Sequence, residues 1–305
     1  MQQYQEYIND LDELITQASK NREQAKEIID VIRPLIKFIY NELNTIKYEA
    51  TEEEITKLKQ SVIRMRQVYH GELIVVIGYI IAVLYHFHSY RDVISIVESY
   101  FPKTIDYSYI TNDEDIGVFG YYYGLTKIKM GDYRQAATAL EKAFIVCKED
   151  RREELLMYLV PLKLRLGQYP SKFVMNKYGC EMLKDLCDFV SRGDIGRFEE
   201  LIHENEIGLF RIGMYEVYQS LRLIVYRNLI EKISIIKKTH KLFIQSIVEV
   251  ANSLIENEEK KVDSETVINI LMNMHYYGIL KANLIISMNA LVMQPQNALE
   301  FYSDN

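Results

Sequence analysis

The sequence contains no tryptophan, and residues that form turns are scarce, with 13 glycines and 5 prolines in 305 residues. Together these two types make up roughly 6% of the chain, about half of their usual share. Sandwiches and barrels reverse direction often, so this composition excludes an all-β fold and predicts a mostly helical one. The chain is 49% apolar and 26% charged, which is typical of a globular protein and too apolar for disorder.

Cysteine is also rare, and the three residues are Cys147, Cys180 and Cys187. Their odd number and the absence of a Cys-x-x-Cys motif argue against a disulfide framework or a zinc knuckle, so we expect a reducing compartment. The first residues lack the basic start and apolar core of a signal peptide, so we expect no secretory export. Residues 73–85 are uninterruptedly apolar, but this run is shorter than the roughly 20 residues that cross a bilayer, so we expect a core helix.

Residues with catalytic or metal-binding chemistry do not occur at useful spacings. His86 and His88 are two apart and would point in different directions on a helix, so they cannot hold one metal ion. The chain has no phosphate-binding loop and no nucleophile or dinucleotide motif. We expect the acidic residues 113–115 to form a solvated loop and the tyrosines 121–123 to pack in the core. The sequence therefore predicts no catalytic residue, no metal, no cofactor and no enzyme.

Apolar residues at helical spacing predict several long helices in residues 1–70, which contain no glycine. From about residue 71 to 205 the sequence is self-similar at a shift of 43, which places Tyr79 on Tyr122. The second copy carries Gly124 and several alanines, which let two helices approach closely. These features predict stacked helix pairs that resemble tetratricopeptide repeats and form a solenoid.

The pattern changes after Gly213. A mostly apolar helix is predicted over residues 214–237, followed by a short extended piece at 242–244 and a second helix to about residue 255. Asp263 can cap a third helix, which would end near Tyr277.

The next residues alternate with a period of two. One face would carry Leu280, Ala282, Leu284 and Ile286, and the other Lys281, Asn283 and Ser287. A turn and a return strand at residues 291–293 would complete a two-stranded wing. The predicted fold is thus an all-α solenoid of tetratricopeptide-like repeats ending in a small winged-helix domain with a short antiparallel β wing. Its parts would be an N-terminal helical region (1–70), the solenoid (71–212) and the winged helix (213–305).

Charge is the most informative signal for function. The net charge is −7, from 36 basic and 43 acidic residues, which argues against a general polyanion binder. Between residues 211 and 241, however, seven basic residues accompany only two acidic ones. The basic residues of this segment are Arg211, Arg222, Arg227, Lys232, Lys237, Lys238 and Lys241.

Two interpretations of this segment stay open. In the first, the lysines complement the C-terminal dipole of a helix, while Arg222 and Arg227 pair with acids elsewhere. In the second, the segment forms part of a phosphate-binding surface that a partner completes. The candidate nucleic-acid-binding residues are then Lys237, Lys238, Lys241, Lys281 and Arg227.

Five segments together resemble the PCI-domain family, and within it the branch that serves nuclear mRNA export. They are YYYGLTKIKMGDYRQAATALEKAF (121–144), YLVPLKLRLGQYPS (158–171), SRGDIGRFEELI (191–202), IVYRNLIEKISIIKKTHKL (224–242) and YYGILKANL (276–284). The resemblance covers about residues 118 to 295. The chain departs from the family at Lys281-Ala282, where Lys-Gly is usual, and at residues 296–299, where Asn-Pro-Phe-Pro is usual.

The resemblance implies a non-enzymatic scaffold subunit of a transcription-coupled mRNA export complex. It would pair through its winged-helix edge with a larger PCI-like scaffold subunit, bind a small acidic disordered subunit and hold RNA or DNA on a shared composite surface. It implies a location in the nucleus, at the nuclear pore or also in the cytoplasm, and neither a membrane nor a small-molecule substrate.

Two alternatives remain at this point. A signalosome-linked or proteasome-lid PCI subunit would use the same surfaces for protein–protein contacts alone. From another class, an enzyme or an adaptor would bind peptides in the solenoid groove.

Overall fold

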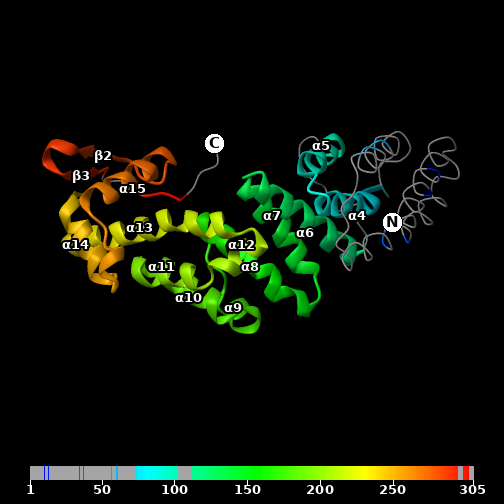
Figure 1. Ribbon diagram of the computed structural model, residues 1–305, viewed down its shortest axis with the longest axis horizontal. Helices are drawn as coiled ribbons and strands as arrows, with labels where there is room; N and C mark the ends of the chain where they lie inside the picture. The colour runs from blue at the N-terminus through cyan, green and yellow to red at the C-terminus, as the bar shows by residue number, and fades with distance from the viewer. Residues whose placement is uncertain are drawn as a thin grey trace. The chain divides into compact units, whose positions relative to one another are not determined.

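The computed structural model describes residues 73–101, 112–294 and 298–301, together with single positions at 10, 13, 34, 37, 56 and 60 (Figure 1). The chain forms two compact units, residues 1–152 and 153–305, and each is described by itself below. The division into residues 1–70, 71–212 and 213–305 stays a prediction, and nearly all of its first part lies outside the described residues.

The described elements of the first unit are helices. They are α4 Leu73–His86, α5 Tyr90–Tyr100, α6 Asp113–Lys129, α7 Tyr133–Val146 and the 3₁₀ turn η2 Glu149–Arg151. Helix α6 packs on both α7 and α4. The approach of α6 to α7 is close because Gly124 has no side chain, and a Cβ there would lie 2.6 Å from Cγ of Leu140. Helix pairing in this unit agrees with the predicted repeats.

Helix α4 is the apolar run that was expected to be a core helix, and residues 77–84 are all buried. Among the described residues, no helix combines the length and the apolar character needed to span a bilayer. The Tyr79 hydroxyl donates a hydrogen bond of 3.1 Å to Asp115 at the start of α6.

This contact corrects one expectation. The acidic residues 113–115 are not a solvated loop but the first turn of α6, which Asn112 caps by accepting from the Glu114 amide. Carboxylates are favoured in a first helical turn because they face the positive end of the helix dipole. Asp115 is only 2% exposed and receives the Tyr79 hydroxyl, so its carboxylate joins α6 to α4.

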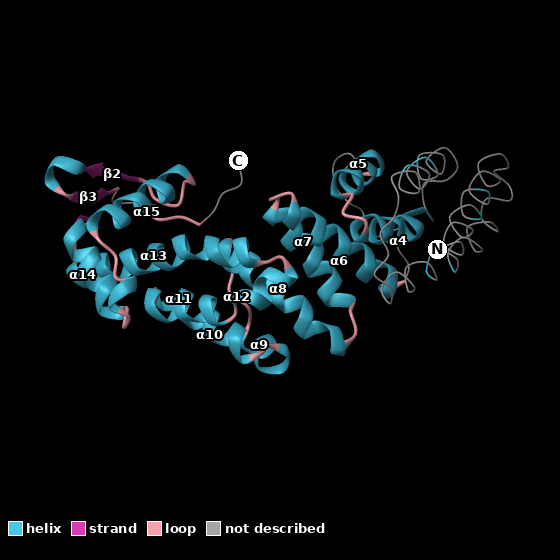
Figure 2. Cartoon of the chain, in the orientation of Figure 1, coloured by secondary structure: helices cyan, strands magenta, loops and turns pink. Residues whose placement is uncertain are grey.

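The second unit contains most of α8 and all that follows (Figure 2). Its helices are α8 Arg152–Arg165, α9 Lys172–Tyr178, α10 Glu181–Arg192, α11 Ile195–Glu204, α12 Glu206–Ile212, α13 Tyr215–Lys237, α14 Ile244–Leu254 and α15 Ser264–Tyr276. Its strands are β1 Lys241–Phe243, β2 Ala282–Ile285 and β3 Ala290–Met293, with 3₁₀ turns η3 Glu258–Lys260 and η4 Ile286–Met288.

Helix α13 is the central element of this unit, since it contacts α10, α11, α12, α14 and α15. Ten of its 23 residues are buried, and all of these except Asn228 are apolar or aromatic. Asn228 is a buried polar residue in this helix, and its amide donates to the Val190 carbonyl at 2.6 Å and to the Tyr169 hydroxyl at 3.3 Å. These bonds tie α13 to α10 and to the segment after α8.

Helices α14 and α15 and the three strands form the winged helix. The sheet order is β1-β3-β2 and both pairs are antiparallel, so β1 adds a third strand to the predicted two-stranded wing. Leu242, Leu291 and Met293 are buried on the inner face of the sheet. With this sheet, the predicted solenoid and winged-helix class is confirmed.

One position of the predicted wing is wrong. We expect Ile286 to share one strand face with Leu284, but it lies beyond the end of β2 and is 69% exposed. The alternation stops because β2 ends at Ile285 and the 3₁₀ turn η4 begins at the next residue. Only within a strand do successive side chains point to opposite faces.

Close contact between α11 and α14 generates the first testable prediction. A Cβ added at Gly196 would lie 1.8 Å from the backbone oxygen of Leu254, a position that no side-chain rotation can relieve. We expect Gly196→Ala to lower the free energy of unfolding by about 3 kcal/mol, measured by urea denaturation, since overpacking forces a backbone shift.

Gly208 in α12 provides the matched control, because a Cβ there meets no atom within 4 Å. Gly208→Ala should leave stability unchanged or raise it by about 1 kcal/mol, because alanine is the better helix former. Equal stability of the two variants would show that α11 and α14 are not packed this closely.

The cap of α15 generates a second prediction, on pH dependence. The Asp263 carboxylate accepts hydrogen bonds from the amide and hydroxyl of Thr266, and the hydroxyl bond is the main reason that the pKa of Asp263 is lowered. A lowered pKa in the folded state stabilises the protein above the unfolded value of 3.8, and this contribution is lost as the pH falls through the lowered value.

Asn is an equally good cap but does not titrate, so Asp263→Asn isolates the charge. We expect the urea midpoint of the wild type to be higher than that of the variant at pH 6. The difference should disappear in strong acid, near pH 2, as the Asp263 carboxylate becomes protonated. A difference that stays constant between these pH values would contradict the role of the carboxylate charge.

Candidate nucleic-acid interface

The first group of predicted site residues lies where α13 turns into β1. Lys237 is the last residue of α13, and Lys238 follows in the left-handed conformation with φ of 49°. The Ser234 hydroxyl donates to the Thr239 carbonyl at 2.8 Å, which holds the reversal of the chain. A short hydrogen-bonded turn therefore brings the two adjacent lysines next to the start of the sheet.

Lys241 begins β1, and its amide donates to the Thr239 hydroxyl at 3.1 Å. It lies opposite Val292 on the outer, solvent-facing side of the sheet, where its ammonium is 5.6 Å from the centre of the Phe243 ring. We name Lys237, Lys238 and Lys241 the turn lysines. All three are exposed, and within the described part of the chain none of them has an ion pair.

Lys281 lies across the sheet from the turn lysines. The Lys281 carbonyl accepts a hydrogen bond from the amide of Gln294, which follows β3. On the β1 side of β3, the Met293 amide donates to the backbone carbonyl of His240. Lys281 and Lys241 thus flank β3 at the same end of the sheet, about two strand spacings or roughly 10 Å apart. Unlike the turn lysines, Lys281 has an acidic partner, since its ammonium donates to the Glu300 carboxylate.

Arg227 lies ten residues before Lys237 on α13, which corresponds to about 15 Å along the helix axis. Its side chain is 11% exposed and pairs with Glu231 one turn later. The guanidinium also donates to the Leu299 carbonyl at 3.4 Å, and it lies 4.4 Å from the centre of the Phe301 ring. Among the described residues, the five predicted cations therefore divide into three lysines without an acidic partner and two cations, Lys281 and Arg227, that have one.

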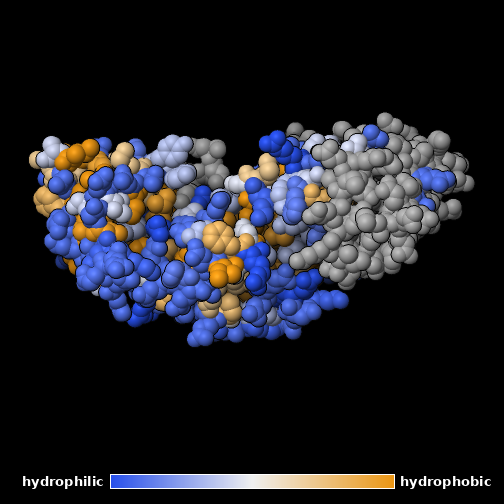
Figure 3. Space-filling model, viewed as in Figure 1, coloured by the Kyte–Doolittle hydropathy of each residue, from blue (hydrophilic) through white to orange (hydrophobic). Residues whose placement is uncertain are grey.

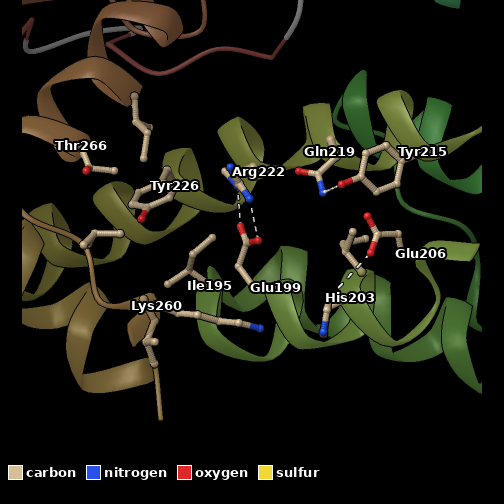
Figure 4. Close-up of a pocket in the computed structure, with 14 residues that line it drawn as sticks. Ile195, Glu199, His203, Glu206, Tyr215, Gln219, Arg222, Tyr226, Lys260 and Thr266 are labelled. Atoms are coloured by element: carbon tan, nitrogen blue, oxygen red, sulfur yellow. Dashed lines mark hydrogen bonds and ion pairs between the residues drawn. The ribbon is translucent and has the colours of Figure 1, made fainter. Parts of the chain in front are cut away.

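A second feature of this unit could not be predicted from the sequence. Between α11, α13 and the winged helix lies a cavity of about 400 Å³, in which Glu199 and Arg222 face each other (Figure 4). Two hydrogen bonds of 2.5 and 2.6 Å join the guanidinium to the carboxylate. Burial alone lowers the pKa of Arg222, but the hydrogen bonds and charge of Glu199 outweigh it and raise the pKa overall.

This ion pair agrees with the first interpretation of the basic segment, in which Arg222 and Arg227 pair with acids. Sequence reasoning identified Arg222 as a cation but not its partner, since Glu199 is 23 residues away on another helix. A spacing of that length carries no pairing signal without the tertiary fold.

Burial opposes ionisation of two cysteine thiols and of the Tyr226 hydroxyl. Burial raises the pKa of the Cys187 thiol to about 12 and that of the Tyr226 hydroxyl to about 12. Burial likewise raises the pKa of Cys147, so these two thiols stay protonated at neutral pH. His86 is hydrogen-bonded to Tyr122, and no group of three His, Cys, Asp or Glu side chains among the described residues could hold a metal ion.

Exposed apolar side chains gather at the end of the second unit that carries the wing (Figure 3). Phe243 is 53% exposed, and Ile286 and Met288 in η4 are 69% and 56% exposed. Phe243 pairs with Ala290, and the Ile244 amide donates to Asn289, so β1 and the residues after η4 are neighbours. This apolar surface lies at the opposite end of β1 from Lys238.

Comparison with known proteins gives several significant relatives, while no family model matches the chain. The chain is 30% identical over 186 residues to a PCI domain-containing protein 2 homolog of Drosophila melanogaster, covering 59% of this chain and 45% of that protein. It is 29% identical over 182 residues to PCI domain-containing protein 2 of Xenopus laevis, again covering 59% and 45%. Protein CSN12 homolog of Schizosaccharomyces pombe is 24% identical over 165 residues, covering 52% and 39%.

The chain thus spans less than half the length of the curated relatives that it matches. Several of these relatives carry the same name, and the helices and three-stranded sheet of the structure fit a helical solenoid with a winged helix. The resemblance inferred from the sequence motifs is therefore confirmed: over about three-fifths of its length this chain is similar to PCI domain-containing protein 2, a protein of the PCI-domain family.

Proposed function

We propose that this protein is a non-enzymatic scaffold subunit of a nuclear, transcription-coupled mRNA export complex. It pairs with a larger scaffold subunit that has a PCI-like module, also binds a small acidic disordered subunit, and holds RNA or DNA jointly with these partners. Its location is the nucleus, at the nuclear pore. The similarity to PCI domain-containing protein 2 supports a role in a multisubunit complex.

The observation that carries the nucleic-acid part of this proposal is the group of turn lysines. In a chain of net charge −7, Lys237, Lys238 and Lys241 are exposed, close together and without an acidic partner in the described structure. Cations that gain little from contacts within their own chain are available to replace the counterions of a phosphate backbone.

The composition of the winged helix supports contacts to the phosphate backbone and not sequence-specific contacts to bases. Helix α15 holds the place of a recognition helix, but its sequence SETVINILMNMHY contains no lysine or arginine. A helix that reads the major groove normally depends on such residues for base and phosphate contacts. Binding through the turn lysines alone would depend on salt and not on sequence, so a partner has to supply further contacts.

Reversal of the turn lysines tests this proposal. We expect K237E/K238E/K241E to weaken binding of single-stranded RNA by the complex with its partner subunits, without lowering the melting temperature. Loss of three phosphate contacts should make the slope of log K against log salt shallower by about 2. Fluorescence anisotropy over a salt series measures this slope.

The matched control is K142E/K172E/K184E, which makes the same change of net charge at three exposed lysines elsewhere. This control should bind RNA with nearly the salt slope of wild type. If both triple variants lose affinity equally, only overall charge matters. If K237E/K238E/K241E binds as wild type at low salt, the turn lysines are not part of the interface.

A second candidate function is a PCI subunit, signalosome-linked or of the proteasome lid, that acts only through protein–protein contacts. The similarity to Protein CSN12 homolog shows that the matches are not confined to proteins named PCI domain-containing protein 2. The exposed apolar side chains Phe243, Ile286 and Met288 beside the edge strand β1 support association with a protein. The two functions differ in whether the purified complex binds RNA at all.

A further inference from the structure

A short segment after the wing returns along the sheet. The Ala298 carbonyl accepts from the Lys281 amide at 2.7 Å, and the Glu300 amide donates to Ile279 at 2.8 Å. Between these bonds, Leu299 pairs with Leu280 in an antiparallel bridge. We name residues 298–301 the strap. It continues the sheet on the side of β2, just before that strand begins.

The strap contacts both of the predicted cations that are not free. Its Glu300 carboxylate forms the ion pair with Lys281. Its Leu299 carbonyl accepts from Arg227, and the Phe301 ring lies 4.4 Å from the Arg227 guanidinium in a cation–π contact. Residues 299–301 thus contact two cations, Lys281 on the wing and Arg227 on α13.

The closed position of the strap is not optimal for Arg227. Among the described residues, the buried Nε–H of this side chain has no hydrogen-bond acceptor. An unsatisfied buried donor destabilises the arrangement that buries it, so some free energy is regained when the site opens to water. On its other side Phe301 packs against Gly167, where a Cβ would lie 2.4 Å from the ring. A few specific contacts therefore stabilise the closed position of the strap, while the unpaired Nε–H of Arg227 destabilises it.

We propose that the strap is an autoinhibitory cover of the nucleic-acid interface. In the closed state only the turn lysines are available, and the strap neutralises Lys281 and shields Arg227. A phosphate backbone bound at the turn lysines competes with Glu300 for Lys281, whose strand position is roughly 10 Å away across the sheet. Displacement of the strap then frees Lys281 and uncovers Arg227, which keeps its ion pair with Glu231, so the surface gains one or two cations. This inference rests on the proposed binding of nucleic acid at the turn lysines.

The first experiment weakens the strap with E300Q/F301A. Single-stranded RNA binding by the full chain in complex with its partners is measured between about 50 and 200 mM salt. One or two additional phosphate contacts should steepen the slope of log K against log salt by about 0.7 to 1.4. The ratio of affinities at these two salt concentrations should then become about three to seven times larger than that of wild type.

The matched control is E258Q/F173A. Glu258 also forms an exposed ion pair with a lysine, and Phe173 is 72% exposed, so this variant removes the same groups without touching the strap. It should keep the wild-type salt slope. An equal gain in both variants would mean that the added net charge explains the effect, and it would overturn the proposal.

A second variant locks the strap closed with a disulfide. Its oxidised and reduced forms are compared with each other, so a change in folding caused by the substitutions does not affect the result. Leu280 and Leu299 are a non-hydrogen-bonded antiparallel pair, whose Cα atoms lie about 4.5 Å apart, a separation that a disulfide can bridge. Oxidised L280C/L299C should bind RNA no more tightly than wild type and with a shallower salt slope, and a reductant should restore wild-type binding. Binding that is the same in the oxidised and reduced forms would overturn the proposal.

The two proposals fail in different ways. If reversal of the turn lysines abolishes binding while E300Q/F301A binds as wild type, the interface is correct and the strap is not a cover. If reversal of the turn lysines has no effect, the proposed interface is wrong, and the strap proposal is then wrong with it.

Discussion

Burial of helix α13 is the constraint on which the second unit depends. This 23-residue helix contacts helices before it and the winged helix after it, and ten of its residues are buried. Burying a leucine, isoleucine or valine side chain stabilises a protein by roughly 1.5 to 3 kcal/mol, so the apolar length of α13 accounts for much of the stability of this unit. Asn228 makes the packing of α13 specific, because a buried side-chain amide requires hydrogen-bond partners and finds them in the Val190 carbonyl and the Tyr169 hydroxyl.

The same constraint determines which charges are exposed. Where a cation of α13 is partly buried, an acid or an aromatic ring compensates for the burial, as Glu199 does for Arg222 and Glu231 and Phe301 do for Arg227. At the end of the helix burial stops, and Lys237 and Lys238 project into water with no such requirement. Free lysines are therefore found at the exit of a buried helix, where the negative end of the helix dipole also favours them.

The winged helix combines a polar and an apolar surface on one small sheet. Lys241 stands at one end of β1, and the exposed Phe243 stands at the other, beside the turn that carries Ile286 and Met288. Strands β1 and β2 are both edge strands, but the strap pairs with the residues that precede β2. The edge of β1 thus remains the more accessible one for pairing with another chain, which agrees with a subunit that works beside a partner.

The sequence by itself determined the helical class, the α13 helix, the Asp263 cap and the strands of the wing. Each of these depends on neighbours a few residues apart, through helical spacing, local hydrogen bonds or alternation. The scarcity of glycine and proline and the motif resemblance agreed with the same fold. The local pattern failed at two places. At Ile286 it failed because β2 ends at the residue before it, and at residues 113–115 it failed because α6 begins earlier than expected.

Only the tertiary structure decided which of the five candidate cations are free. The three turn lysines share one stretch of sequence with Arg227, in which the i+4 spacing of Glu231 is the one local sign that Arg227 is paired. The other contacts come from residues that are distant in the chain: Glu300 pairs with Lys281, and Leu299 and Phe301 contact Arg227. Ion pairs between distant residues form because folding brings the charges together in partly buried places, and spacing along the sequence does not record that proximity.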